Sequence, residues 1–152
     1  MKIIGIGKNY VTDASEIDAL KTGVQTIFTK PESSLVTNNQ DIPFPGITNQ
    51  LAYEVELVAK IGKQGKAIAL EDAEAYISEI AVGIDFTAKD VLNASREQKG
   101  PWALAKGFDG ASPMSAFKPI ADFKNLADIN FDLKINNAQT QIGNTSLMIY
   151  TF

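Results

Sequence analysis

Two glutamates and an aspartate stand inside short apolar runs, where acidic residues are uncommon. From Tyr53 to Ile61 the sequence Tyr-Glu-Val-Glu-Leu-Val-Ala-Lys-Ile is largely apolar at every second position, which is typical of a strand with one covered face. Glu54 and Glu56 therefore leave this strand on the same side, about 6.5 Å apart along its axis. Asp85 lies between two apolar residues, although aspartate has a low preference for strands. Three such carboxylates could converge on one cation.

The same pattern has a simpler interpretation. A pair of glutamates on an amphipathic strand usually belongs to a solvated face. Val58 follows on the side of Glu54 and Glu56, which suits a partly covered strand better than a fully wet one. Buried acids are tolerated when they are paired or bind a metal, and a divalent cation would remove the repulsion among them. A metal site is therefore our hypothesis, and a solvated face is the alternative.

The composition limits which ion and which chemistry are available. The chain has no histidine and no cysteine. This excludes Ser-His-Asp and Cys-His catalysis and zinc sites built on imidazole. Any metal would be held by oxygen atoms, which favours Mg²⁺ or Mn²⁺ first and Ca²⁺ next.

Length and charge restrict the class of protein further. A chain of 152 residues with 45% hydrophobic residues can bury one ordinary core, so we expect a single domain over residues 1–152. No apolar run is long enough to cross a bilayer and the N-terminus lacks the form of a signal peptide, which predicts a soluble, cytoplasmic protein. The net charge of −4 comes without a basic block, so neither nucleic acid nor a membrane is expected as a partner.

Hydrophobic periodicity and turn residues predict the elements that position these acids. The expected strands are Lys2–Ile6, Val24–Thr29, Tyr53–Ile61, Ile80–Phe86 and Asn130–Ile135, the last followed by a hairpin turn at Asn136-Asn137 and a returning strand from Gln139. The expected helices are Ala14–Lys21, Leu70–Ile80 and one that Thr87 caps and that runs to about Gln98. Residues 32–50 are rich in turn formers and predict a long loop with brief extended pieces.

Two further charged positions need an explanation. Asp13, with Glu16 three residues later, has the pattern of a capping box for the helix Ala14–Lys21. Lys106 interrupts an apolar run, Ala-Leu-Ala-Lys-Gly-Phe, over residues 103–108. A buried lysine is costly unless it meets acids or the negative charge of a ligand. Lys106 is therefore a second candidate for the site that contains the three acids.

Six segments in order along the chain together resemble the fumarylacetoacetate hydrolase family. They are Gly-Lys-Asn-Tyr at 7–10, Phe-Thr-Lys-Pro at 28–31, Tyr-Glu-Val-Glu-Leu at 53–57, Gly-Ile-Asp-Phe-Thr-Ala-Lys-Asp at 83–90, Gly-Pro-Trp-Ala-Leu-Ala-Lys-Gly-Phe-Asp at 100–109 and Gln-Ile-Gly-Asn-Thr-Ser-Leu-Met-Ile at 141–149. The resemblance implies a mostly β fold with short helices (α+β), a mixed β-sandwich or roll, and a homodimer.

The resemblance also implies site residues. A divalent cation, Mg²⁺ or Mn²⁺, would be bound by Glu54, Glu56 and Asp85. Lys106 would face the metal-bound substrate, and Lys30 would lie near the site as a substrate contact. Relatives of this kind act on small 2-oxo acids with a second carbonyl. They hydrolyse a C–C bond in acylpyruvates or fumarylacetoacetate, or they decarboxylate oxaloacetate. The alternative is a degenerate relative that binds a cation and a small dicarboxylate without turnover.

The chain departs from the family pattern at two places. Hydrolytic relatives carry a histidine three residues before a glutamate and use the pair to activate water; here the glutamate is Glu16 and the histidine position holds Asp13. A like-charge neighbour could raise the pKa of Asp13 and make it a base, or the two residues could be only a helix cap. Relatives also continue into a C-terminal segment with a Thr-Gly-Thr-Pro motif. We therefore expect a fold that is incomplete at its C-terminus.

Overall fold

The computed structural model describes the chain except for residues 22 and 24. The contacts divide the chain into two compact units. The first contains Met1–Lys8, Gln25–Glu56 and Gly83–Ser115, and the second contains Asn9–Val24, Leu57–Val82 and Ala116–Phe152. The single domain expected over residues 1–152 stays a prediction.

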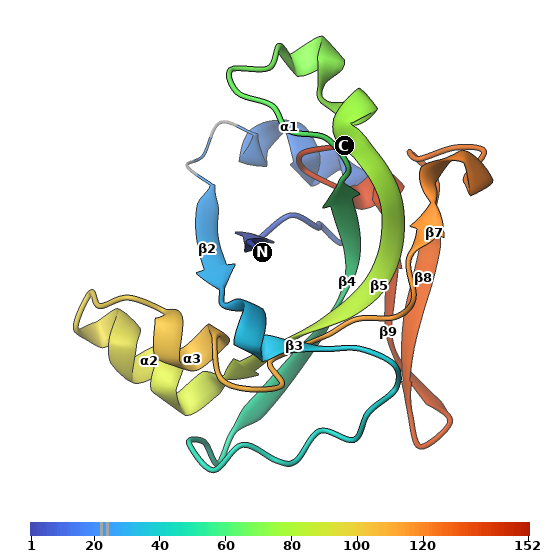
Figure 1. Ribbon diagram of the computed structural model, residues 1–152. Coiled ribbons are helices and arrows are strands. Elements are labelled where there is room, and N and C mark those ends of the chain that lie inside the picture. Colours follow the sequence, from blue (N-terminus) through green and yellow to red (C-terminus); the bar gives the residue numbers. More distant parts are fainter. Residues whose placement is uncertain (22, 24) are drawn as a thin grey trace. The chain divides into compact units, whose positions relative to one another are not determined.

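Strands make up most of the regular structure (Figure 1). They are β1 Ile3–Gly7, β2 Thr26–Lys30, β3 Leu35–Val36, β4 Leu51–Ile61, β5 Ile77–Ala88, β6 Ser112–Pro113, β7 Lys118–Pro119, β8 Asn130–Ile135 and β9 Ala138–Asn144. The α-helices are short: α1 Ile17–Leu20, α2 Lys89–Glu97 and α3 Ala103–Lys106. A sheet-dominated fold with a few short helices confirms the fold class expected from the sequence.

The two longest strands, β4 and β5, carry the predicted acids. They pair in a sheet of order β4-β5-β7, and each of them passes through both units. The strand predicted at Tyr53–Ile61 is confirmed and begins two residues earlier, at Leu51. The strand predicted at Ile80–Phe86 is also confirmed, as the later part of β5.

In the first unit, β1 and β2 form an antiparallel pair in which Gly5 faces Phe28. The ring of Phe28 lies across Gly5, because a Cβ atom at that position would be only 2.3 Å from the ring's Cζ atom. The predicted strand Lys2–Ile6 corresponds to β1. The strand predicted from Val24 begins outside the described residues, and its later part corresponds to β2.

The helices α2 and α3 lie side by side in the first unit (Figure 1). The helix predicted from Thr87 is present as α2, but Thr87 still belongs to β5 and Ala88 is the N-cap, without a side-chain bond. Asp90 in the first turn accepts hydrogen bonds from the Thr48 hydroxyl and from the Asn49 amide at 3.0 Å. These bonds lower the pKa of Asp90 and tie the predicted long loop to α2.

The second unit contains the helix predicted at Ala14–Lys21. It is present as a 3-10 turn, Ala14–Glu16, followed by α1. The predicted hairpin is also there, formed by β8 and β9. Asn136 and Asn137 have φ angles of 51° and 65°, as expected for a two-residue turn in which asparagine tolerates a left-handed backbone.

The predicted helix Leu70–Ile80 is wrong. The segment forms two 3-10 turns, Leu70–Asp72 and Glu74–Tyr76, and β5 starts at Ile77. The prediction of a helix was based on apolar residues at helical spacing. The β-branched Ile77 and Ile80 fit a strand well, and Ile80 also pairs with Lys118 of β7, so sheet pairing outweighs the local helical pattern.

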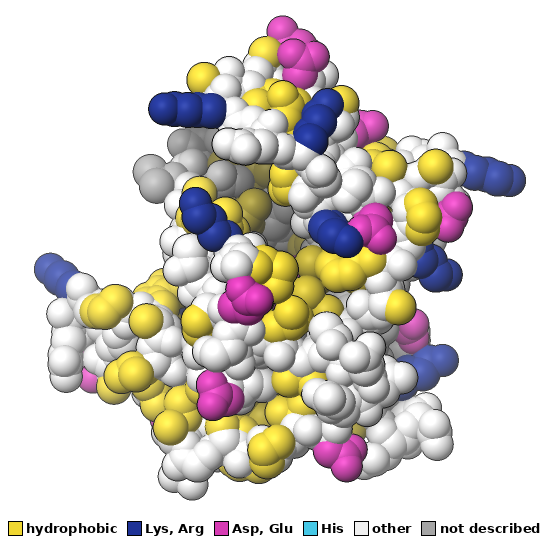
Figure 2. Space-filling view, viewed as in Figure 1, with side chains coloured by type: hydrophobic (Ala, Val, Ile, Leu, Met, Phe, Trp, Pro, Cys, Tyr) yellow, Lys and Arg dark blue, Asp and Glu magenta, His cyan; other side chains and the backbone are white. Residues whose placement is uncertain are grey.

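Each unit buries apolar side chains but also exposes some. Leu92 in the first unit and Ile80 in the second are only 2% exposed. On the visible face, hydrophobic atoms reach the surface at many places (Figure 2). In the β1–β2 pair, Ile4, Ile6 and Ile27 leave the strands on the same side, because Ile6 and Ile27 are directly opposite, and all three are exposed. None of the helices in the described part of the chain is long and apolar enough to cross a membrane.

Candidate functional site

A cluster of charged side chains in the first unit surrounds the carboxylate of Asp85. Lys30 Nζ lies 2.8 Å from Asp85 Oδ1, and Lys106 Nζ is paired with the other oxygen, Oδ2. Lys106 Nζ also lies 3.4 Å from Glu54 Oε2. Two of the three predicted acids, Glu54 on β4 and Asp85 on β5, are therefore linked through Lys106, which the sequence analysis assigned to the same site.

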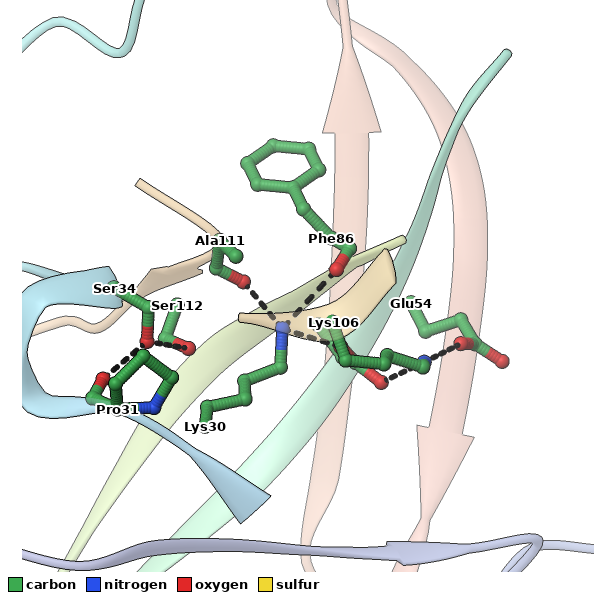
Figure 3. Close-up of polar contacts among 9 residues, drawn as sticks. Lys30, Pro31, Ser34, Glu54, Phe86, Lys106, Ala111 and Ser112 are labelled. Carbon is green, nitrogen blue, oxygen red and sulfur yellow. Dashed lines mark hydrogen bonds and ion pairs between the residues drawn. The ribbon is translucent and has the colours of Figure 1, made fainter. Parts of the chain in front are cut away.

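Lys30 is held by the backbone as well as by charge. Its ammonium group donates hydrogen bonds to the carbonyl oxygens of Phe86, at 3.1 Å, and Ala111, at 2.8 Å (Figure 3). The residue is only 6% exposed. Burial lowers the pKa of Lys30, and the nearby charge of Asp85 opposes that effect. Lys30 therefore joins the end of β2 to β5 and to the segment that follows α3.

Lys106, the last residue of α3, is equally buried at 5% exposed. Its partners are side chains: the carboxylates of Asp85 and Glu54, and the ring of Phe28, whose centroid is 4.8 Å from Nζ. A cation over an aromatic face gains electrostatic attraction while it stays partly desolvated. No backbone oxygen among the described residues accepts a bond from this ammonium group.

Two glycines allow the lysine-bearing segments to come close. Gly107 directly follows Lys106, and a Cβ atom there would be 2.8 Å from the Cδ atom of Pro31, the residue after Lys30. Gly5 leaves room for Phe28, the ring beneath Lys106. Ser34 Oγ is hydrogen-bonded to the Pro31 carbonyl and lies 3.0 Å from Ser112 Oγ (Figure 3). Close backbone approach thus packs β2 against α3.

Glu56 differs from the other two acids. Burial raises its pKa to about 7, and the negative charges of Asp85 and Glu54 add to this effect, whereas Lys106 opposes it. No hydrogen bond contributes to the shift. A carboxyl group that is half-buried and close to two like charges favours its neutral form, since ionisation would add a third negative charge.

A divalent cation can be tested against these oxygen atoms. As they stand, no three acidic side chains in the part of the chain that the structure describes are grouped closely enough to hold an ion. The donor chemistry nevertheless fits a hard cation, because the three groups are carboxylates. Two buried oxygens of β5, Asp85 Oδ1 and Thr87 Oγ1, have no hydrogen bond within the described residues. Lys30 Nζ does lie 2.8 Å from Oδ1 as an ion pair. Unused buried oxygen atoms are costly unless a ligand satisfies them.

Asp13 and Glu16 belong to the second unit, where they form the predicted capping box. The Asp13 carboxylate accepts bonds from the Ser15 amide at 2.9 Å and from the Ser15 hydroxyl at 2.8 Å. These bonds lower the pKa of Asp13. The expectation that a like-charge neighbour raises this pKa is therefore wrong, because hydrogen bonds to the ionised form dominate. Their predicted catalytic role is not tested by these contacts.

Some members of the cluster could not be recognised from residue type. The carbonyl groups of Phe86 and Ala111 bind Lys30, and a backbone acceptor carries no signal in the sequence. Phe28 lies within the Phe-Thr-Lys-Pro segment, so its presence was noted but its contact with Lys106 was not. A glycine paired with an aromatic residue across two strands is the signal that could have indicated this contact.

Comparison with known proteins places the chain in a family. Residues 2–152 match the family described as "Fumarylacetoacetate (FAA) hydrolase C-terminal". A mitochondrial oxaloacetate tautomerase from Caenorhabditis elegans is 34% identical over 149 residues, which cover 98% of this chain and 70% of the relative. A mitochondrial oxaloacetate decarboxylase from Dictyostelium discoideum is 32% identical over 150 residues, covering 98% and 69%.

The fold gives the same answer. The crystal structure of fumarylpyruvate hydrolase from Pseudomonas aeruginosa in complex with Mn²⁺ and pyruvate has a TM-score of 0.88 and 28% sequence identity, and covers 99% of this chain and 67% of that one. The two sequence relatives and this solved structure are named as enzymes. The chain belongs to the fumarylacetoacetate hydrolase family, and it spans 65 to 70% of the length of such relatives.

Proposed function

We propose that this chain belongs to a divalent-metal-dependent enzyme that cleaves a C–C bond in a small 2-oxo acid with a second carbonyl, such as an acylpyruvate or oxaloacetate. The observation that carries the proposal is the cluster in which Lys106 links Asp85 to Glu54 beside a Glu56 of raised pKa. Strongly coupled acids and buried lysines in one place are typical of functional sites. The relatives named as oxaloacetate and fumarylpyruvate enzymes support the same substrate class.

Each residue of the cluster has a role in this proposal. Glu54, Glu56 and Asp85 hold the cation, which is Mg²⁺ or Mn²⁺. When bound, such an ion polarises the carboxylate and 2-oxo oxygens of the substrate. Lys106 then presents its ammonium group to the oxyanion that develops as the bond breaks. Preorganised charge of this kind is commonly worth about 3 kcal/mol in the barrier.

The contacts of Asp13 favour decarboxylation or tautomerisation over hydrolysis. Both of these reactions need stabilisation of an enolate but no activated water. Asp13 accepts two bonds from Ser15 and has a lowered pKa, so it is a weak base near neutral pH. Hydrolysis through Asp13 and Glu16 stays a lesser candidate. A homodimer and a cytoplasmic location also remain expectations.

The test is an assay of pyruvate release from oxaloacetate and from an acylpyruvate, with keto–enol conversion followed by ultraviolet absorbance. The full chain is assayed with Mn²⁺, and the background is the same Mn²⁺ without protein. We expect turnover above this background and a loss of about tenfold or more in Glu54→Gln. Equal rates in the two proteins would remove the metal role of Glu54. Binding of Mn²⁺ without turnover would select the alternative, a degenerate relative that binds but does not react.

A further inference from the structure

The Asp85 carboxylate lies between two buried lysines that are held in different ways. Lys30 approaches Oδ1 and Lys106 approaches Oδ2. Both lysines are more than nine-tenths buried. What differs is the rest of their surroundings. Among the described residues, backbone carbonyls hold the ammonium group of Lys30, whereas side chains alone hold that of Lys106.

Lys30 is fixed independently of the acids. Its hydrogen bonds go to the carbonyls of Phe86 and Ala111, which belong to two separate segments. These two carbonyls and Asp85 Oδ1 surround Nζ with three oxygens, and an ammonium group has three donors. Substrate binding by Lys30, which the resemblance implied, would require one of these contacts to be given up. An ionised carboxylate has about four lone-pair sites on its two oxygens, so Oδ1 can contact Lys30 and still offer a lone pair to a cation.

The ammonium group of Lys106 lies where a cation could replace it. Its charged partners are Asp85 Oδ2 and Glu54 Oε2, which are themselves proposed donors to the cation. The Glu54 contact is long, 3.4 Å, and the Glu54 side chain is 57% exposed. A cation that binds both carboxylates would have to take the place of this ammonium group, since two positive charges cannot share one position.

We propose that Lys30 is a positioning residue, which holds Asp85 in the orientation needed for a divalent cation, whereas Lys106 is the ammonium group that the cation displaces and thereby makes available for the substrate. This inference rests on the cation site of the proposed function. It assigns opposite behaviour to two lysines that contact the same carboxylate.

The test is titration of the full chain with Mn²⁺ alone, by calorimetry, after treatment with a chelator and dialysis. The variants are Lys30→Met and Lys106→Met. If charge were the only effect, each variant would bind Mn²⁺ more tightly than the wild type, because each loses a positive charge beside Asp85. We expect instead that Lys106→Met lowers the Kd and that Lys30→Met raises it, by about tenfold or more.

A control separates positioning from loss of stability. Ser34→Ala removes a buried hydroxyl next to Pro31 that is bonded to the Pro31 carbonyl and close to Ser112, without touching Asp85. It should lower the melting temperature and leave the Kd for Mn²⁺ unchanged. A Lys30→Met protein that binds Mn²⁺ as well as the wild type, or a Ser34→Ala protein that weakens binding equally, would overturn the proposal. A wild-type chain that binds no Mn²⁺ would instead overturn the proposed function.

A second measurement needs only the wild-type chain and Lys106→Met, in case Lys30→Met does not fold. Buried lysine ammonium groups give separate nitrogen resonances when their protons exchange slowly, and Lys106→Met assigns one of them by its loss. On titration with Mg²⁺, a diamagnetic ion, we expect the Lys106 resonance to move or broaden and the Lys30 resonance to stay in place. Movement of both resonances to a similar extent would contradict the proposal.

Discussion

Among single residues, Asp85 is the one on which the cluster depends. It has two lysine partners, one on each oxygen, whereas burial and the two neighbouring acids raise the pKa of Glu56 and favour its neutral form. Glu54 and Glu56 are identical side chains two positions apart on β4, but their environments differ. Glu54 is largely exposed and paired with Lys106, while Glu56 is half-buried. Environment rather than residue type separates their roles.

The state of Glu56 predicts how stability depends on pH without metal. Its folded pKa of about 7 is above the ordinary value of 4.5, so the folded chain keeps a proton that the unfolded chain releases. Its contribution to stability is therefore complete below pH 4.5 and is lost as the pH rises through 7, by at most about 1.4 kcal/mol per pH unit. Urea unfolding in the presence of a chelator, from pH 5 to pH 8, measures this loss. Glu56→Gln, a neutral mimic, should lack it, and parallel pH profiles of the two proteins would contradict the raised pKa.

Among elements, the β1–β2 pair helps to position Lys106, because Phe28 of this pair contacts the lysine. Phe28 of β2 lies across Gly5 of β1, and the ammonium group of Lys106 lies over the Phe28 ring. It also lies beside Trp102, with ring centroids 6.0 Å apart. Through Phe28, Gly5 of β1 thus affects the position of the Lys106 ammonium group at the end of α3.

We therefore expect Gly5→Ala to be costly. The new methyl group would lie within 2.3 Å of the Phe28 ring, and displacement of a packed aromatic ring typically costs about 1–3 kcal/mol. Gly46→Ala is the matched control, because nothing lies within 4 Å of a Cβ atom there. Urea unfolding of the two variants measures the difference. Equal stability of both variants would show that the ring moves without cost.

Elements whose pattern is local in the sequence could be predicted, whereas elements that depend on distant pairing could not. Alternation identified β4, a short apolar run identified the part of β5 that carries Asp85, and paired asparagines identified the β8–β9 turn. Leu70–Ile80 was mistaken for a helix because the pairing that makes Ile77–Ile80 a strand comes from β4 and β7, far away in sequence. In the site, the acids and Lys106 could be recognised because they are charged residues within apolar runs. The carbonyl groups that bind Lys30 could not be recognised, because every residue has a backbone carbonyl.

At the scale of the whole molecule, neutralisation of carboxylates by lysine leads us to expect a fold that does not depend on metal. Two ammonium groups are already paired with Asp85 and Glu54, and the raised pKa of Glu56 favours its neutral form, so we expect no large repulsion when a cation is removed. The family relationship covers nearly all of this chain but only about two thirds of the relatives, so activity must be measured on the chain itself.

Metal removal should therefore leave the fold in place. We expect the far-ultraviolet circular dichroism spectrum to be the same with and without a chelator. Added Mn²⁺ should raise the free energy of unfolding by mass action, by about 2.7 kcal/mol at a free concentration one hundred times the Kd. Thermal unfolding over a range of Mn²⁺ concentrations measures this increase. Collapse of the spectrum in the chelator would mean that the lysines do not compensate the acids.

The isoleucine-bearing side of the β1–β2 pair has a practical consequence. Ile4, Ile6 and Ile27 are 59%, 46% and 62% exposed, and a small sheet with an uncovered apolar side is prone to associate with itself. Concentrated samples should bind a hydrophobic fluorescent dye and scatter light. Ile27→Thr, which keeps the β-branched shape, should reduce both signals without changing the melting temperature by more than a few degrees. That single replacement is the first to make before spectroscopy at high concentration.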